Sequence, residues 1–154
     1  RLAEEVERLA AERSREASGF AALRGSLLPP VEGAVVEVLF GKTLNARFHT
    51  EVHQNGLDLR APKGAAVRAV APGRVAFAAS FRAYGNLAIV DHGGGFHTLY
   101  AHLDSFDVKE GDEVEAGRRI GRVGDTGSLK GAYLYFEIRD GAKPVDPLPW
   151  LRPR

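Results

Sequence analysis

Residues 132–139 read Ala-Tyr-Leu-Tyr-Phe-Glu-Ile-Arg and predict a β-strand, because aromatic and aliphatic residues alternate there without glycine or proline. Successive side chains of a strand face opposite ways, so Tyr133 and Tyr135 share one face with Glu137 and Arg139. Further candidate strands are residues 34–39, 65–69, 74–78, 86–90, 97–102 and 119–123, and the Gly-Gly-Gly at 93–95 predicts a turn. The 18 glycines suit tight turns, so we expect an all-β body built as a compact antiparallel sheet.

The first 26 residues differ from this body. No glycine or proline occurs from residue 2 to about residue 17, and Leu2, Val6 and Leu9 recur at helical spacing among charged residues. The apolar seam is interrupted at Arg13 and Glu16. Two interpretations stay open: a solvated helix that leans on its own domain, or the end of a longer upstream coiled coil. We expect a helical segment at 1–26 and one domain at 27–154, and the chain resembles a fragment of a longer precursor.

Composition excludes several classes of function. Lysine and arginine number 21 against 20 aspartates and glutamates, so the formal charge of +1 predicts no attraction to nucleic acid or to an anionic membrane. The chain has no cysteine, which excludes disulfide scaffolds, thiolate metal sites and cysteine nucleophiles. No apolar run approaches the roughly 20 residues that cross a bilayer. A single globular domain of soluble composition is expected.

A weak internal repeat suggests a rival function. Residues 64–69 and 111–116 share a glycine, a valine three positions later and an alanine five positions later. The repeat either arises by chance or resembles the hairpins of biotinyl and lipoyl carrier domains. Such a carrier needs a modifiable lysine at a hairpin tip, and Lys109 and Lys130 lie outside the repeated segments.

An ordered set of motifs over roughly residues 31–151 resembles LytM, or lysostaphin-type, peptidase domains. The set comprises Gly56-Leu57-Asp58, Ala61-Pro62, Gly73-Arg74-Val75, Tyr84-Gly85-Asn86, His92, residues 98–103, Gly111-Asp112, residues 124–127 and Phe136-Glu137-Ile138. The resemblance implies a compact antiparallel β-fold with a long groove that holds one zinc ion and binds peptide cross-links of peptidoglycan.

The family holds its zinc with the histidine and aspartate of an HxGxD motif and with the second histidine of an HxH motif. Carried onto this chain, those positions are Gln54, Asp58 and Tyr135, while Tyr133 and His102 stand at the positions of the two assisting histidines. Catalytic zinc typically needs three protein ligands and an open water position. An amide is a poor donor and a phenol must lose a proton to bind, so we expect no metal, no cofactor and no catalysis.

A neighbouring histidine is the alternative source of a ligand. His53 adjoins Gln54 and His49 lies four residues before His53, but strand alternation predicts that His53 points away from the groove. His92 and His97 are expected to serve structure. Asp58 either accepts backbone hydrogen bonds or contacts a partner, and His102 is either a satisfied, half-buried histidine or part of the groove.

The tyrosines support two interpretations. They either fill the volume left by the metal or form rigid aromatic contacts with a protein partner, to which Arg139 would add a forked donor suited to a carboxylate. The predicted partner-binding groove comprises Gln54, Asp58, Tyr84, His102, Tyr133, Tyr135 and Arg139.

Residues 134–139 and 145–151, preceded by a charged helix, resemble the EnvC-type murein hydrolase activators. That resemblance implies a periplasmic protein of the bacterial envelope whose groove binds and activates a peptidoglycan amidase during cell separation. It also implies control by a transporter-like divisome complex through the upstream coiled coil. The alternatives are a zinc metalloendopeptidase with altered ligands and a domain that binds peptidoglycan directly.

Overall fold

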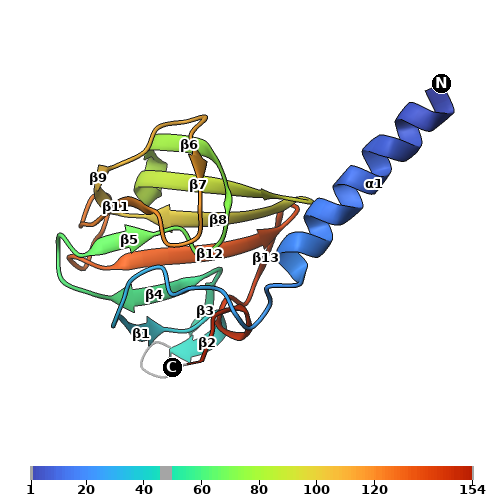
Figure 1. Ribbon diagram of the computed structural model, residues 1–154. Helices are drawn as coiled ribbons and strands as arrows, with labels where there is room; N and C mark the ends of the chain where they lie inside the picture. Colours follow the sequence, from blue (N-terminus) through green and yellow to red (C-terminus); the bar gives the residue numbers. More distant parts are fainter. Residues whose placement is uncertain (1, 46–49, 154) are drawn as a thin grey trace.

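The computed structural model describes residues 2–45 and 50–153, as a long helix followed by short antiparallel strands (Figure 1). Helix α1 (Leu2–Ala21) lies within the segment at 1–26 that we expected to be helical. Figure 1 shows it projecting away from the strands. Leu2, Val6 and Leu9 are 78%, 57% and 50% exposed, so this part of the seam does not pack against the domain. Both interpretations of the helix, as a solvated helix on its own domain or as the end of a coiled coil, stay predictions.

The helix joins the body at its last turn through Phe20. This side chain is only 3% exposed and stacks on Trp150 and His92, with ring centroids 5.2 and 4.7 Å apart. The chain then leaves the helix, and Leu27 forms a parallel bridge with Leu151 near the C-terminus. Within the described ranges, no helix is both long and apolar enough to span a membrane.

The main sheet has eight strands in the order β1-β4-β12-β8-β7-β6-β10, with β13 paired to β12, and every paired neighbour is antiparallel. Its strands are β1 (Val35–Val38), β4 (Leu57–Arg60), β6 (Gly73–Phe81), β7 (Gly85–Gly93), β8 (Phe96–Ala101), β10 (Glu113–Val114), β12 (Leu134–Asp140) and β13 (Lys143–Val145).

A second sheet has the order β5-β11-β9, and β2 and β3 form a separate hairpin. The bounds are β5 (Ala66–Arg68), β9 (Leu103–Phe106), β11 (Arg119–Val123), β2 (Gly41–Asn45) and β3 (Thr50–Gln54). Two short 3-10 helices follow β6 and β13, at η1 (Arg82–Tyr84) and η2 (Leu148–Trp150). The all-β expectation is confirmed, and every predicted strand is present. The shortest additional strands and the β2–β3 hairpin carried too little alternation to be predicted.

Strand β12 lies inside the main sheet and supplies both the core and the site. Leu134, Phe136 and Ile138 are completely buried in the core, where the ring of Phe136 lies 5.4 Å from that of Tyr100. The alternate residues face the opposite way, as the sequence predicted. Because β12 is paired to β4 on one side and β8 on the other, three strands converge beneath one surface.

Candidate functional site

A pocket of about 240 Å³ opens over the junction of β3, β4, η1, β8 and β12. We call it the groove pocket, and it is lined by His53, Gln54, Asn55, Asp58, Ala83, Tyr84, His102, Tyr133 and Tyr135. The structure therefore brings together all the predicted groove residues except Arg139. Strand register explains the gathering, because Tyr135 pairs with Asp58 across one neighbour and with Ala101, which precedes His102, across the other.

The turn between β3 and β4 depends on Gly56. A Cβ atom there would lie 2.3 Å from the carbonyl oxygen of Phe136, so only glycine allows the turn to press against β12. This close approach places Gln54, on one side of the turn, within reach of Asp58 on the other. Nε2 of Gln54 donates a 2.7 Å hydrogen bond to Oδ1 of Asp58.

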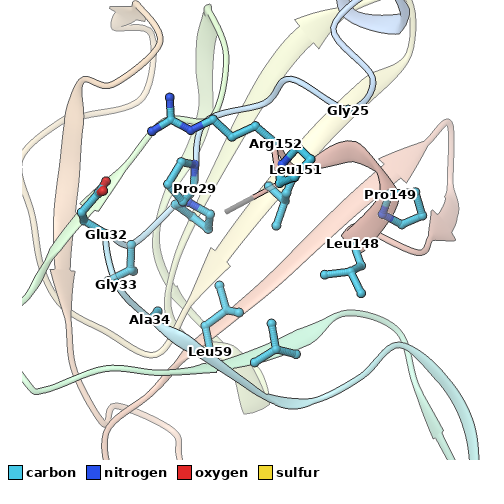
Figure 2. A pocket seen from close by; sticks show the side chains of 14 residues that line it. Gly25, Pro29, Glu32, Gly33, Ala34, Leu59, Leu148, Pro149, Leu151 and Arg152 are labelled. Atoms are coloured by element: carbon cyan, nitrogen blue, oxygen red, sulfur yellow. The ribbon is translucent and has the colours of Figure 1, made fainter.

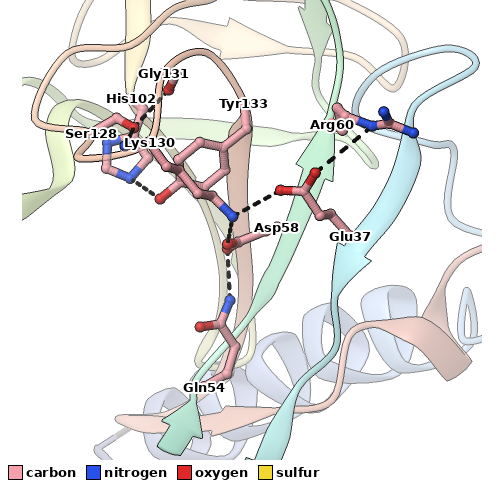
Figure 3. A network of polar contacts seen from close by, with 9 residues as sticks. All are labelled: Glu37, Gln54, Asp58, Arg60, His102, Ser128, Lys130, Gly131 and Tyr133. Carbon is pink, nitrogen blue, oxygen red and sulfur yellow. Dashed lines mark hydrogen bonds and ion pairs between the residues drawn. The ribbon is translucent and has the colours of Figure 1, made fainter. Parts of the chain in front are cut away.

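Asp58 is 7% exposed and has a side-chain partner on each carboxylate oxygen. Its second oxygen, Oδ2, accepts a 2.6 Å hydrogen bond from Nζ of Lys130. The same ammonium donates a 3.0 Å bond to Oε1 of Glu37 on β1 (Figure 3). Asp58 is thus the buried end of an ionic network that joins β1, β4 and the loop before β12.

Lys130, the central cation of this network, was not among the predicted groove residues. It lies in the loop between β11 and β12. At the tip of this loop, Oγ of Ser128 donates a hydrogen bond to the carbonyl of Gly131 and accepts one from the amide of Lys130. Its Nζ also lies 4.4 Å from the ring centroid of Tyr133. Burial opposes the charged form, but hydrogen bonds to Asp58 and Glu37 raise the pKa of Lys130 above its ordinary value.

His102 has both ring nitrogens occupied. Nδ1 lies 2.7 Å from the carbonyl oxygen of Thr126, which can only accept, so Nδ1 carries the proton. Nε2 therefore accepts the hydrogen bond from the Tyr133 hydroxyl, at 2.9 Å. The backbone of His102 is held in the left-handed region at φ 63°, where its amide donates to the carbonyl of Tyr84. His102 is 5% exposed, which agrees with the interpretation of a satisfied histidine.

Glu137 forms a second network beneath the pocket. It has no exposed surface, and its carboxylate accepts hydrogen bonds from the hydroxyls of Tyr135 and Tyr84, at 2.6 and 3.3 Å, and from Nε of Arg139 at 2.7 Å. Burial and the Glu137 charge raise the pKa of both tyrosines, so both hydroxyls stay protonated. Arg139 was predicted to offer its guanidinium to a partner. Instead it neutralises a carboxylate of its own strand, two residues away, and does not line the pocket.

These residues do not fit the zinc ion that the family resemblance implies. Both oxygens of Asp58 are engaged by Gln54 and Lys130, and the tyrosine hydroxyls at the two histidine positions are bonded to His102 and Glu137. Among the residues that the structure describes, no three His, Asp or Glu side chains are grouped so as to hold a metal ion.

The neighbouring histidines differ in outcome. His53 is among the residues that line the groove pocket, at the end of β3. Its ring lies 6.2 Å from that of Phe40 in an edge-on arrangement. His49, the other candidate ligand, lies outside the described residues.

His92 and His97 are placed away from the groove pocket. Nδ1 of His92 donates to the carbonyl of Pro72 at 2.7 Å, and Nε2 lies 2.8 Å from the Thr98 hydroxyl. Burial lowers the pKa of His92 to about 4. Nε2 of His97 lies 3.8 Å from the carboxylate of Asp91. Both arrangements agree with the structural role that we expected.

A second pocket, of about 1030 Å³, lies between the segment after α1 and the C-terminal segment, and nothing in the sequence indicated it. Figure 2 shows Pro29, Leu59, Leu148 and Leu151 around a common space, with Glu32 and Arg152 as its charged neighbours. Its lining is mainly apolar and includes none of the groove-pocket residues.

Comparison with known proteins relates the chain to cell-wall proteins. The model of peptidase family M23 matches residues 52–147. Mpg of Neisseria meningitidis serogroup B, a DD-carboxypeptidase/endopeptidase, is 40% identical over 109 residues, which cover 71% of this chain and 25% of Mpg. NlpD of Escherichia coli K12, a murein hydrolase activator, is 40% identical over 126 residues, which cover 81% of this chain and 31% of NlpD. The chain thus spans a quarter to a third of the length of these relatives.

The fold also matches that of solved structures. A zinc-containing peptidase from Vibrio cholerae superposes with a TM-score of 0.73 and 29% sequence identity. The match covers 84% of this chain and 40% of the Vibrio chain. Relatives by sequence and by structure therefore include both peptidases and an activator, so only the residues of the site separate these two functions.

Proposed function

Because this chain belongs to peptidase family M23, as its LytM-type motifs predicted, we propose that it is a non-catalytic member that activates peptidoglycan amidases. The groove pocket is its partner-binding surface, and the process is cell-wall remodelling with daughter-cell separation. The observation that carries this proposal is the state of Asp58. Its two oxygens accept hydrogen bonds from Gln54 and Lys130, so its negative charge is already paired with an ammonium.

Loss of hydrolysis follows from the same geometry. A zinc-bound water reaches a pKa near 7 only when several protein ligands hold the ion with one position open. Here the family's histidine positions carry an amide and two phenols, whose hydroxyl pKa values are raised by burial and nearby carboxylates. Neither phenol provides a ligand at neutral pH, so the pocket has no means of activating water through the metal.

The surroundings of the pocket suit a protein partner. Leu129, next to Lys130 at the loop tip, is completely exposed, and Phe81, whose ring lies 6.3 Å from that of Tyr84, is 41% exposed. Aromatic side chains with satisfied polar groups around them are typical of interface hot spots.

The wider cellular context is part of the proposal. NlpD supports it, because that relative is a murein hydrolase activator and aligns over most of this chain. We propose a location in the bacterial envelope, on the periplasmic side. The exposed seam of α1 supports an upstream coiled coil, through which a transporter-like divisome complex would exert control.

The test is activation of a purified peptidoglycan amidase, measured as dye release from labelled sacculi. Leu129→Ser and Tyr133→Ala should each reduce activation at least tenfold. Leu148→Ser is the matched control, because Leu148 is 45% exposed and lines the second pocket instead. Full activation by both the Leu129 and the Tyr133 variants, or none by the wild-type protein, would contradict the proposal.

A zinc metalloendopeptidase with altered ligands is the second candidate, favoured by the similarity to Mpg and to the Vibrio peptidase. It predicts one zinc ion per chain by elemental analysis and cleavage of peptide cross-links that a chelator abolishes. Direct binding to peptidoglycan would instead appear as sedimentation with purified sacculi in the absence of any amidase.

A further inference from the structure

We propose that Lys130 is a tethered cation that replaces the metal ion of the family: its ammonium is the permanent counter-charge of Asp58 and excludes divalent cations from the groove pocket. This inference is independent of the amidase partner. It explains what the buried Asp58 does in a pocket whose residues do not fit a zinc ion.

Two carboxylates from adjacent strands converge on this one ammonium. Asp58 on β4 lies at 2.6 Å and Glu37 on β1 at 3.0 Å from Nζ of Lys130. The Asp58 side chain is 9% exposed and that of Lys130 is 41% exposed, so Lys130 is the solvent-accessible partner of a nearly buried carboxylate. Figure 3 shows the Lys130 side chain extending from its loop toward the carboxylates of both Asp58 and Glu37.

The charge of Asp58 requires a partner in this environment. An ionised carboxylate removed from water is strongly destabilising unless it is paired and hydrogen-bonded. The amide of Gln54 satisfies one oxygen without supplying charge, so the positive charge comes from Lys130. Asp58 therefore has a structural role that needs no metal ion.

Zinc and this ammonium compete for Asp58. A zinc ion binds carboxylate oxygen at roughly 2.0–2.2 Å, close to an ammonium hydrogen-bonded to the same carboxylate. Like charges this close repel strongly in a partly buried site. Zinc therefore binds less tightly while Lys130 stays paired with Asp58.

Neighbouring residues hold the Lys130 side chain in position. The loop tip is held by the Ser128 hydrogen bonds, which fix the point from which the side chain extends. The ring of Tyr133, at a histidine position of the family, lies 4.4 Å from Nζ and adds a cation–π contact. Tyr133 thus does more than fill space, because it supports the cation that lies over it.

The first experiment restores the three family histidines with Gln54→His, Tyr133→His and Tyr135→His, and adds Lys130→Met in a second protein. Zinc affinity is measured by titration calorimetry with zinc chloride and by elemental analysis. We expect the protein that also lacks Lys130 to bind zinc at least tenfold more tightly. Lys109→Met is the matched control in the same background, because Lys109 forms an exposed pair with Asp112, and it should change nothing. Equal zinc affinity with and without Lys130 would overturn the proposal.

A second experiment tests the pairing in the native sequence, in case the histidine-restored proteins do not fold. It measures the folding equilibrium constants of Lys130→Met, Asp58→Asn and the double variant by urea unfolding. If Lys130 is the counter-charge, the factor by which Asp58→Asn lowers the folding equilibrium constant should be at least tenfold smaller in the Lys130→Met background. The exposed Lys109–Asp112 pair, treated in the same way, should show less than twofold coupling. Additive effects at Lys130 and Asp58 would refute the inference.

Discussion

The hydroxyl of Tyr135 donates a 2.6 Å hydrogen bond to Oε2 of Glu137, a carboxylate with no exposed surface and two residues along the same strand. Tyr84 and Arg139 complete the set of donors, at 3.3 and 2.7 Å. Because these groups satisfy one another, the polar atoms of this part of the pocket wall are already paired. The partner that we propose would therefore meet a preformed surface.

Removing the hydroxyl of Tyr135 should destabilise the protein. Tyr135→Phe keeps the ring but removes the shortest hydrogen bond to a buried carboxylate, for which we expect a loss of about 1–3 kcal/mol in the free energy of unfolding. Urea unfolding followed by circular dichroism measures this. Tyr133→Phe is the control and should cost less, because the hydroxyl of Tyr133 bonds a neutral histidine instead of a charged group. A larger cost for Tyr133→Phe would contradict this account of the network.

The free energy of unfolding should decrease as the pH is lowered, because His92 titrates. Burial lowers its pKa from 6.5 to about 4, so below pH 6.5 the unfolded chain binds a proton that the folded protein rejects. We expect a loss of about 3 kcal/mol at most as pH falls from 6.5 to 4, and no contribution from His92 above that window. Urea midpoints at pH 7, 5.5 and 4.5 measure the slope. His92→Gln should flatten the slope in this interval, and an unchanged slope would assign the acid sensitivity to other groups.

The attachment of helix α1 should depend on Phe20. This ring packs against His92, Phe96 and Trp150, so Phe20→Ala should destabilise the protein by about 3–5 kcal/mol and expose the indole. Trp150 is the single tryptophan of the chain, so its fluorescence reports the change directly. Val6→Ala is the control, since Val6 lies on the exposed seam and should leave both stability and fluorescence unchanged. A red shift of the Trp150 fluorescence in the Val6 variant would show that Val6 packs near the indole and is not exposed.

The close approach at Gly56 should not tolerate a side chain. Gly56→Ala places a Cβ atom 2.3 Å from the carbonyl oxygen of Phe136, so the β3–β4 turn must move and separate Gln54 from Asp58. We expect a lower melting temperature and loss of amidase activation. Gly19→Ala provides the contrast, because a Cβ atom there would meet no other atom within 4 Å and alanine favours helix by about 1 kcal/mol. If Gly56→Ala were as stable as the wild type, the tight packing of this turn would be disproved.

The period of a strand explains which site residues could be predicted from the sequence. Tyr133 and Tyr135 share a face wherever the strand lies, because alternation is a property of the backbone alone. The same period did not indicate that His53, at the end of β3, would be among the lining residues. Arg139 was placed on the correct face, but Glu137 on that face binds it, and spacing could not show that this carboxylate is buried.

By itself, the sequence determined the antiparallel β-body, the family and most of the residues that line the groove pocket, since these follow from local alternation, turn chemistry and ordered motifs. Only the tertiary structure decided that Lys130 neutralises Asp58 across 72 residues and that helix α1 stands away from the strands. Local pattern carries no information on such pairs. They depend on how loops and strand register bring distant segments together. They also depend on burial, because a charged group removed from water is stable only beside an opposite charge.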